Sequence, residues 1–215
     1  MTSHPGGWGA FELGHYVGWR KSRMLGIRKY MNTDYFYMKE LIELGGGSGD
    51  NGEEFYKLGC TNVQCLEARL PHIQRGKEKY PHIRFTKWDG DKNKLTEKKD
   101  IILHWGLLYH LGEIEDHLKN VCENCNVLLL ETEVADSDKD DFSITIDEAG
   151  PGQAFNKKGM RPSRSYVEKV LDQNGFKYKL CNDKILNYWI HKYDWKEENK
   201  NNFKKGRRRF WICWI

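Results

Sequence analysis

The sequence predicts an α/β fold, in which short apolar strands alternate with helices around one sheet. Three observations carry this prediction. An apolar run enters a glycine-rich turn over residues 41–52, the apolar segments that follow alternate with helical patterns, and several of these segments end in an acidic residue. At 215 residues the chain suits one such domain with a short appendage. We therefore divide it into an N-terminal arm and lid helix, residues 1–36, and a main domain, residues 37–215.

The composition is that of a folded protein with a very polar surface. Aromatic residues make up 13% and charged residues 31% of the chain. No segment approaches the length of a membrane span, and the N-terminus lacks the pattern of a secretory signal, so we expect a cytoplasmic protein. The net charge of +4 permits RNA binding without requiring it. The six scattered cysteines, which include the pair Cys122 and Cys125, are interpreted as free thiols without a metal site.

Residues 16–38 are predicted to form a lid or flanking helix that follows an arm or loop over residues 1–14. Aromatic and apolar residues recur in the helical segment near a 3.6-residue period. We expect most of these aromatic side chains to pack on the main domain. Arg20 and Arg23 share the pattern and are candidates for contact with a substrate.

The glycine-rich turn is the predicted cofactor site. Glycines permit positive φ and let a ligand approach the backbone closely. A dinucleotide site would need glycine where the chain has Asp50, and acids in the first turn of the next helix would repel a pyrophosphate. S-adenosylmethionine fits better, because it has no phosphate and its ammonium can be held by Glu43 or Asp50, directly or through water. A flexible loop without a ligand is the alternative. The residues assigned to the cofactor in this turn are Glu43, Gly45, Gly46, Gly47, Gly49 and Asp50.

The next two predicted strands end in acids that can hold a nucleoside. A carboxylate such as Glu67 can accept hydrogen bonds from both ribose hydroxyls, and Ala68 follows it. Asp89 can accept a hydrogen bond from an adenine amine, while Gly90 allows close approach. For Asp89 a solvated loop aspartate is the alternative.

The fourth predicted strand begins at Asp100 and runs into a loop rich in reactive groups. Ligands of open α/β sheets bind at the carboxyl ends of strands, so His104 and Trp105 are assigned to the cofactor, and Tyr109 and His110 to catalysis. A histidine titrates near neutrality when unperturbed, which makes His110 the first candidate for a general base. A hydrogen-bonded structural histidine is the alternative for His104 and His110.

The remaining elements follow from hydrophobic pattern and capping signals. Ser163 is the expected N-cap of a helix that Gly175 closes. Residues 142–161 are expected to be a long connection without regular structure that covers the substrate, and residues 185–202 a helical excursion. The other expected elements are strands at 62–67, 82–89, 127–131, 176–181 and 210–215, the last buried in the sheet, and helices at 52–58, 70–79, 113–121 and 163–174.

This order of strands, glycine turn and acid-ended strands resembles class I S-adenosylmethionine-dependent methyltransferases over residues 37–215. The segment from Glu43 to Gly49, Glu67, Asp89 and the fourth strand carry the resemblance. It implies a Rossmann-like seven-stranded sheet, mostly parallel with an antiparallel last strand and with helices on both faces.

A finer similarity is to the tRNA wobble-uridine carboxymethyltransferase group. In that group the tyrosine that matches Tyr109, together with an arginine near the C-terminus that corresponds approximately to Arg208 or Arg209, holds the extra carboxylate of a carboxylated cofactor. About 36 residues precede the core, fewer than in that group, so we expect ordinary S-adenosylmethionine. The segments that carry this similarity are residues 106–110, 116–118, 129–132, 161–163 and 175–176.

The predicted reaction is methyl transfer to an oxygen or nitrogen of an acceptor, which can be a small molecule, a sugar or a tRNA. The basic run at the C-terminus is either a solvated face or a contact with an anionic substrate. A nicotinamide-dependent oxidoreductase is disfavoured by Asp50, and a non-catalytic RNA-binding protein on the same fold is the other alternative. The residues assigned to the substrate are Arg20, Arg23, Glu133, Arg161, Arg208 and Arg209.

Overall fold

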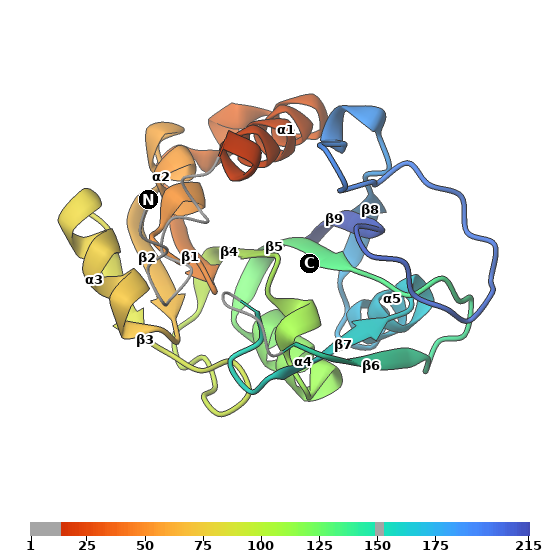
Figure 1. Ribbon diagram of the computed structural model, residues 1–215. Helices are drawn as coiled ribbons and strands as arrows, with labels where there is room; N and C mark the ends of the chain where they lie inside the picture. Colours follow the sequence, from red (N-terminus) through yellow and green to blue (C-terminus); the bar gives the residue numbers. More distant parts are fainter. Residues whose placement is uncertain (1–13, 149–152) are drawn as a thin grey trace.

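A seven-stranded sheet forms the centre of the computed structural model, which describes residues 14–148 and 153–215 (Figure 1). The strand order is β3-β2-β1-β4-β5-β9-β8. The strands β1 to β5 pair in parallel, whereas β9 is antiparallel to both of its neighbours. The predicted sheet and its buried last strand are therefore confirmed. The strands are β1 Glu40–Leu44, β2 Thr61–Glu67, β3 Arg84–Lys87, β4 Lys99–Trp105, β5 Cys125–Glu133, β8 Lys177–Leu180 and β9 Arg208–Trp214.

Helices cover both faces of the sheet, as predicted. One face packs against α4 and α5, and the other against α1, α2 and α3 (Figure 1). Met24 and Ile27, on the inner side of α1, are buried in the hydrophobic core between the sheet and α1, α2 and α3. The helices are α1 Gly14–Tyr30, α2 Asp50–Lys57, α3 Leu70–Lys79, α4 Ile114–Glu123 and α5 Arg164–Gln173.

Three sequence predictions about regular structure are wrong. The segment 142–161 is not irregular throughout, because β6, Ser143–Asp147, pairs antiparallel with β7, Lys158–Pro162. The predicted excursion 185–202 is not helical beyond the short 3₁₀ turn Lys184–Leu186, and Trp189 and two asparagines within it have positive φ. The lid helix ends at Tyr30 rather than at residue 38.

Local chemistry explains the early end of the lid helix. The Asn32 side chain accepts a hydrogen bond from the Asp34 amide at 3.0 Å, which starts the 3₁₀ turn Thr33–Phe36 instead of another helical turn. Met38 then has a positive φ of 61°, a conformation incompatible with a helix. The predicted arm lies almost wholly in residues 1–13, outside the described part of the chain.

The capping predictions for α5 are confirmed. Ser163 accepts a hydrogen bond from the Tyr166 amide at 2.9 Å, and Gly175 after the helix has a φ of 75°. All six cysteines are buried free thiols. Across the described ranges, no set of three or more His, Cys, Asp and Glu side chains is arranged to hold a metal ion. None of the helices in those ranges has the length and apolar character needed to cross a bilayer.

Candidate active site

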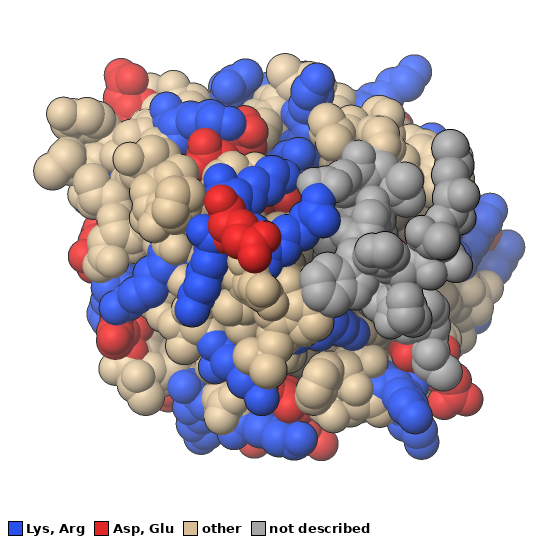
Figure 2. All heavy atoms as spheres, turned by 60° about the vertical axis from the view of Figure 1, so that its left-hand side comes forward, with Lys and Arg blue, Asp and Glu red and all other residues tan. Residues whose placement is uncertain are grey.

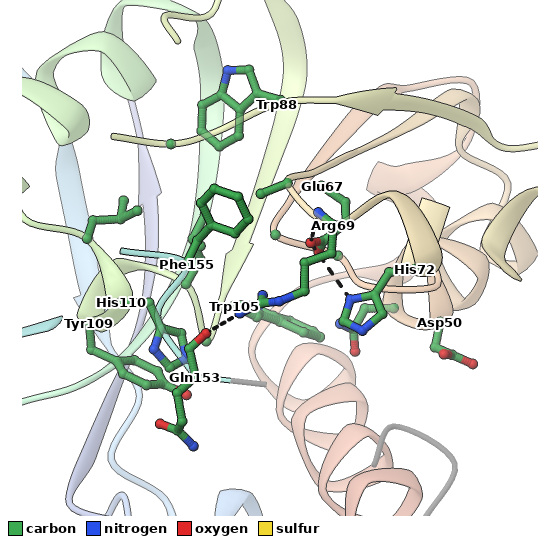
Figure 3. Close-up of a pocket in the computed structure, with 18 of the residues that line it drawn as sticks. Asp50, Glu67, Arg69, His72, Trp88, Trp105, Tyr109, His110, Gln153 and Phe155 are labelled. Atoms are coloured by element: carbon green, nitrogen blue, oxygen red, sulfur yellow. Dashed lines mark hydrogen bonds and ion pairs between the residues drawn. The ribbon is translucent and has the colours of Figure 1, made fainter. Parts of the chain in front are cut away.

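A pocket opens at the carboxyl ends of β1, β2 and β4, next to α1 (Figure 3). This edge is where ligands bind in open parallel sheets, because the loops that leave neighbouring strands diverge there. Figure 3 shows side chains from both halves of the chain around the pocket, with Arg69 hydrogen-bonded to the backbone oxygen of Gln153. Its lining includes these predicted site residues: Arg20, Arg23, Gly45, Gly46, Asp50, Glu67, Ala68, Asp89, Gly90, Trp105, Tyr109 and His110.

The glycine turn is shaped for close contact with a ligand. Gly45, Gly47 and Gly49 have φ values of 63°, 58° and 80°, as the sequence predicts. A Cβ on Gly46 would lie 2.5 Å from both Cys65 Sγ and the Glu43 carboxyl carbon, so only glycine fits. Gly45 and Gly46 line the pocket, whereas Gly47 and Gly49 shape the turn and do not line the pocket.

Glu67 joins the end of β2 to this turn. Its carboxylate accepts hydrogen bonds from the amides of Gly47 at 2.9 Å and Arg69 at 2.8 Å, and His72 Nδ1 lies 3.7 Å away. Burial raises the pKa of Glu67, but the neighbouring His72 imidazole and the hydrogen bonds from the two amides outweigh it and lower the pKa below its ordinary value. Glu67 is therefore a fixed anionic acceptor on the pocket wall.

Asp50 lines the pocket but already has three cationic or hydroxyl neighbours. Its Oδ1 accepts hydrogen bonds from Lys79 Nζ at 2.7 Å and from the Tyr80 hydroxyl at 3.0 Å. Arg20 of α1 lies 3.7 Å from the same oxygen, and so α1 is tied to the start of α2. The charges of Asp50 and Arg20 are thus largely compensated within the protein.

Glu43 lies beneath the turn rather than in the lining of the pocket. One carboxylate oxygen accepts a hydrogen bond from Asn51 Nδ2 at 2.8 Å, and the other from the Gly52 amide at 2.9 Å. Burial raises the pKa of Glu43 to about 7, although these two hydrogen bonds oppose the shift. Glu43 therefore supports the start of α2, and its assignment to the cofactor stays a prediction.

Strand pleating separates His104 from Trp105, because successive side chains of a strand point to opposite faces. Trp105 lines the pocket. His104 points under α4, where its Nε2 lies 2.8 Å from His117 Nε2, and it is absent from the pocket lining. Burial holds the pKa of His104 well below its ordinary value, so the imidazole is neutral. The structure thus gives His104 a structural hydrogen bond, the alternative that the sequence leaves open.

The 3₁₀ turn Leu108–His110 after β4 presents Tyr109 and His110 to the pocket. His110 Nδ1 is hydrogen-bonded to the Glu148 carboxylate, and Arg161 binds the other oxygen of that carboxylate. Burial raises the pKa of Glu148, but His110 and Arg161 outweigh burial and lower it to about 2. Glu148 is therefore ionised at neutral pH and fixes the orientation of the imidazole.

Arg161 holds together three segments beside the pocket. It donates through Nε to Glu133 at 3.0 Å and through Nη1 to the Tyr109 backbone oxygen at 2.8 Å, besides its contact with Glu148. Arg161 and Glu133 are both buried, and neither lines the pocket. Their assignment to the substrate stays a prediction, and their contacts indicate that they position the turn 108–110.

Arg208 makes a second set of buried contacts with the same turn. It donates to Glu131 Oε1 at 2.8 Å, to the Tyr109 hydroxyl at 3.1 Å and to His191 Nδ1 at 3.0 Å. Burial raises the pKa of Tyr109 to about 12, so the phenol is neutral. The neighbouring Arg209 points to the other face of β9, where it binds the backbone oxygens of residues 193 and 195 away from the pocket lining.

Arg23 lies between two indole rings at the base of the lid helix. Its guanidinium is 4.0 Å from the ring centre of Trp19 and 4.9 Å from that of Trp105. Its Nη1 is 3.6 Å from Glu131 Oε2, and its Nη2 donates to Asn51 at 3.3 Å. Glu131 and Glu148 were both missed as site residues in the sequence.

Comparison with known proteins gives matches at the level of structure. No family model matches the sequence, and no curated protein sequence matches it. The N-terminal domain of EvdMO1, determined in the presence of S-adenosylhomocysteine and D-fucose, has a TM-score of 0.66 and 15% identity, covering 93% of this chain and 82% of that chain. The chain shares the fold of this domain.

Two further solved structures share this fold. An S-adenosylmethionine-dependent methyltransferase from Mesorhizobium loti has a TM-score of 0.65 and 12% identity, over 90% of this chain and 98% of that chain. Magnesium protoporphyrin IX methyltransferase from Synechocystis, with bound S-adenosylhomocysteine, has a TM-score of 0.62 and 12% identity, over 93% of this chain and 84% of that chain.

The pocket residues fit an adenosyl cofactor with a charged amino-acid end. Gly45 and Gly46 line the pocket and carry no side chain, so the turn offers bare backbone to a ligand. Glu67 offers a fixed carboxylate. At Gly106 a Cβ would have room, 3.9 Å from Glu131 Oε2 and 4.0 Å from the Tyr109 hydroxyl, so a methyl-sized group can lie there.

Proposed function

We propose that the protein is an S-adenosylmethionine-dependent methyltransferase that transfers a methyl group to an oxygen or nitrogen of its acceptor. The observation that carries this proposal is the shared pocket, where the tight glycine turn, the fixed carboxylate of Glu67 and the oriented imidazole of His110 meet. The fold that the chain shares with methyltransferases supports it.

The residues around the pocket divide by the part of the cofactor that they would hold. Gly45 and Gly46 offer backbone, Glu67 is placed to accept hydrogen bonds from ribose hydroxyls, and Asp89 from an adenine amine. Bound S-adenosylmethionine supplies a methyl group that is already activated on a sulfonium. The protein therefore has to align the acceptor and exclude water, which the aromatic side chains of Trp19, Trp105 and other lining residues support.

His110 is placed to act as the general base for a hydroxyl or protonated nitrogen. Because Glu148 engages Nδ1, that nitrogen carries the proton and Nε2 keeps the lone pair that takes a proton from the acceptor. Arg161 keeps Glu148 in place and ionised. The chain thus holds the imidazole of His110 in one tautomer and one orientation.

The first test is calorimetric titration with S-adenosylmethionine, S-adenosylhomocysteine and NAD. We expect the two adenosyl sulfur compounds to bind and NAD not to bind, and Glu67→Gln to weaken binding because a charged acceptor is lost. Glu97→Gln serves as the matched control, because Glu97 is an exposed acid of the connection between β3 and β4 and does not line the pocket. The absence of binding by both sulfur compounds would contradict the proposal.

The second test concerns His110. We expect His110→Ala to lower the turnover of methyl transfer by roughly 10²- to 10⁴-fold and to leave S-adenosylhomocysteine affinity unchanged, because the imidazole acts on the acceptor. His82→Ala, which removes a half-exposed imidazole at Glu53, is the control. Turnover is measured as transfer of a labelled methyl group, with acceptor screens of hydroxylated small molecules, sugars and tRNA. Unchanged turnover would exclude His110 as the base.

A tRNA wobble-uridine methyltransferase is a second candidate function, which the contact between Arg208 and the Tyr109 hydroxyl favours. Lysine and arginine side chains are interspersed with acids across the face in Figure 2. If tRNA is the acceptor, we expect the rate of its methylation to fall steeply as the salt concentration rises. Salt-dependent tRNA binding without any methyl transfer would instead support the non-catalytic RNA-binding alternative.

A further inference from the structure

A buried ion pair beside the pocket has a loose geometry that the proposed reaction does not explain. Glu131 is fully buried near the carboxyl end of β5, and Arg23 of α1 is 4% exposed. Glu131 Oε2 and Arg23 Nη1 are 3.6 Å apart, which is longer than an N–H···O hydrogen bond. The two side chains face each other without closing the contact.

Each member of this pair has one atom that is buried and unsatisfied. Glu131 Oε1 accepts hydrogen bonds from Arg208 at 2.8 Å and from the Tyr193 hydroxyl at 3.2 Å, but Oε2 accepts none from the described residues. Arg23 Nε likewise donates to no acceptor in the described part of the chain. An unsatisfied buried polar atom costs roughly 1–3 kcal/mol, and more when it is charged. An anionic acceptor and a cationic donor that both lack a hydrogen bond indicate a ligand with complementary groups.

Gly106 leaves room for such a ligand next to Glu131. Its φ of 74° is unfavourable for any other residue, and it lines the pocket directly after β4. An atom at its Cβ position would lie 3.9 Å from Glu131 Oε2 and 3.9 Å from Trp19 Cη2. An ammonium has the size of a methyl group, so this space can admit one beside the carboxylate.

The other acids near the pocket are already engaged. Asp50 binds Lys79 and Tyr80, and Glu43 binds a backbone amide and Asn51. Among the described residues, Glu131 Oε2 is the buried carboxylate oxygen that accepts no hydrogen bond. We propose that Glu131 and Arg23 bind the amino-acid end of S-adenosylmethionine, with its ammonium on Glu131 Oε2 and its carboxylate on Arg23. This proposal rests on the proposed function.

This assignment connects cofactor binding to the catalytic turn. Glu131 Oε1 holds Arg208, and Arg208 donates to the Tyr109 hydroxyl next to His110. A ligand that fixes Glu131 therefore also fixes the contact on which the position of Tyr109 depends. Arg23 in turn ties the same ligand to the lid helix, because Arg23 is a residue of that helix.

The test compares three ligands that differ at the amino-acid end. S-adenosylhomocysteine has both charges, its deaminated analogue keeps only the carboxylate, and 5′-methylthioadenosine lacks the whole end. For the wild-type protein we expect calorimetry to give an affinity for S-adenosylhomocysteine on the order of 10- to 100-fold above that for the deaminated analogue, as a hydrogen bond between charged groups predicts. Equal affinities in the wild type would overturn the proposal without any variant.

The isosteric variant Glu131→Gln then assigns the effect to this side chain. We expect the difference between S-adenosylhomocysteine and the deaminated analogue to fall to a few-fold, with the affinity for 5′-methylthioadenosine unchanged. Asp136→Asn is the matched control, since Asp136, like Glu131, is fully buried and absent from the pocket lining, but it pairs with Arg207 instead of Arg23. It should keep the wild-type difference.

The remaining outcomes separate this proposal from the proposed function. An unchanged difference in Glu131→Gln would overturn only the assignment of the ammonium. An equal loss of affinity for 5′-methylthioadenosine would also overturn it, because Glu131 would then support the whole pocket. Failure of the wild type to bind any of the three ligands would overturn the proposed function as well.

For Arg23 the corresponding probe is the decarboxylated analogue, which Arg23→Gln should no longer distinguish from S-adenosylhomocysteine.

Discussion

The two sides of the pocket consist of different chemical groups, backbone on one side and buried charged side chains on the other. On the side of β1 and β2, glycines with positive φ and backbone amides form the wall, and Glu67 is held by amides. On the side of β5, β7 and β9, buried charged side chains hold one another and the turn that carries His110. These side chains are Glu131, Glu133, Glu148, Arg161 and Arg208.

The two sides differ in how much of their structure depends on residues that are distant in the sequence. The backbone side depends on conformations that each glycine adopts by itself. The charged side depends on pairs that are far apart in sequence, because Arg208 lies 77 residues from Glu131 and 99 from Tyr109. Removing one member of a buried pair leaves the other charge uncompensated, which costs more than the pair contributes.

The largest expected effect follows from removing Arg161. Arg161→Met leaves the buried carboxylates of Glu133 and Glu148 without their shared cation, so we expect the free energy of unfolding to fall by about 3–5 kcal/mol. Urea denaturation measures it. Arg84→Met is the control, because its exposed pair with Glu97 should contribute no more than about 1 kcal/mol. Equal losses in both variants would remove the distinction between the two sides.

Sequence reasoning recovers the backbone side better than the charged side. The positive φ values of the turn are local consequences of glycine, and the glycine-rich run indicates them without saying which positions adopt them. Glu148 could not be found, because it follows a strand whose pairing with β7 was not predicted. Glu131 could have been found, since it lies near the carboxyl end of a predicted strand, the reasoning already used for Glu67. The opposite orientations of His104 and Trp105 could likewise have been predicted, because side chains alternate between the two faces of a strand up to its last residue.

The second prediction uses one buried acid from each side, Glu43 and Glu148, whose pKa values shift in opposite directions. Burial raises the pKa of Glu43 from 4.5 to about 7, so its stabilising contribution is complete below pH 4.5 and is lost as pH rises through 7. For Glu148 burial is outweighed by His110 and Arg161, and the pKa falls to about 2. Its contribution is therefore complete above pH 4.5 and is lost as pH falls through 2.

Urea denaturation between pH 2 and pH 8, without ligand, tests this opposition. Relative to wild type, we expect Glu43→Gln to gain up to about 3 kcal/mol of stability as pH rises from 4.5 to 8, because the cost of ionising a buried acid is gone. Glu148→Gln should show the reverse, a deficit near neutral pH that shrinks by up to about 3 kcal/mol as pH falls to 2. If the free energy of unfolding of both variants changed with pH in parallel with that of the wild type, the pKa shifts assigned to Glu43 and Glu148 would be contradicted.

The smallest expected effect tests the backbone side by itself. Gly46→Ala places a methyl group 2.5 Å from Cys65 Sγ and from the Glu43 carboxyl carbon, so the turn must shift. Overpacking of this kind costs about 1–3 kcal/mol, and the shift should also weaken S-adenosylhomocysteine binding, because Gly46 lines the pocket. Gly112→Ala is the matched control, since its new methyl group would meet only Asp91 at 3.8 Å. We expect that control to stay within about 0.5 kcal/mol of wild type. If Gly46→Ala keeps full affinity, the ligand does not approach the turn, and the charged side alone would have to hold it.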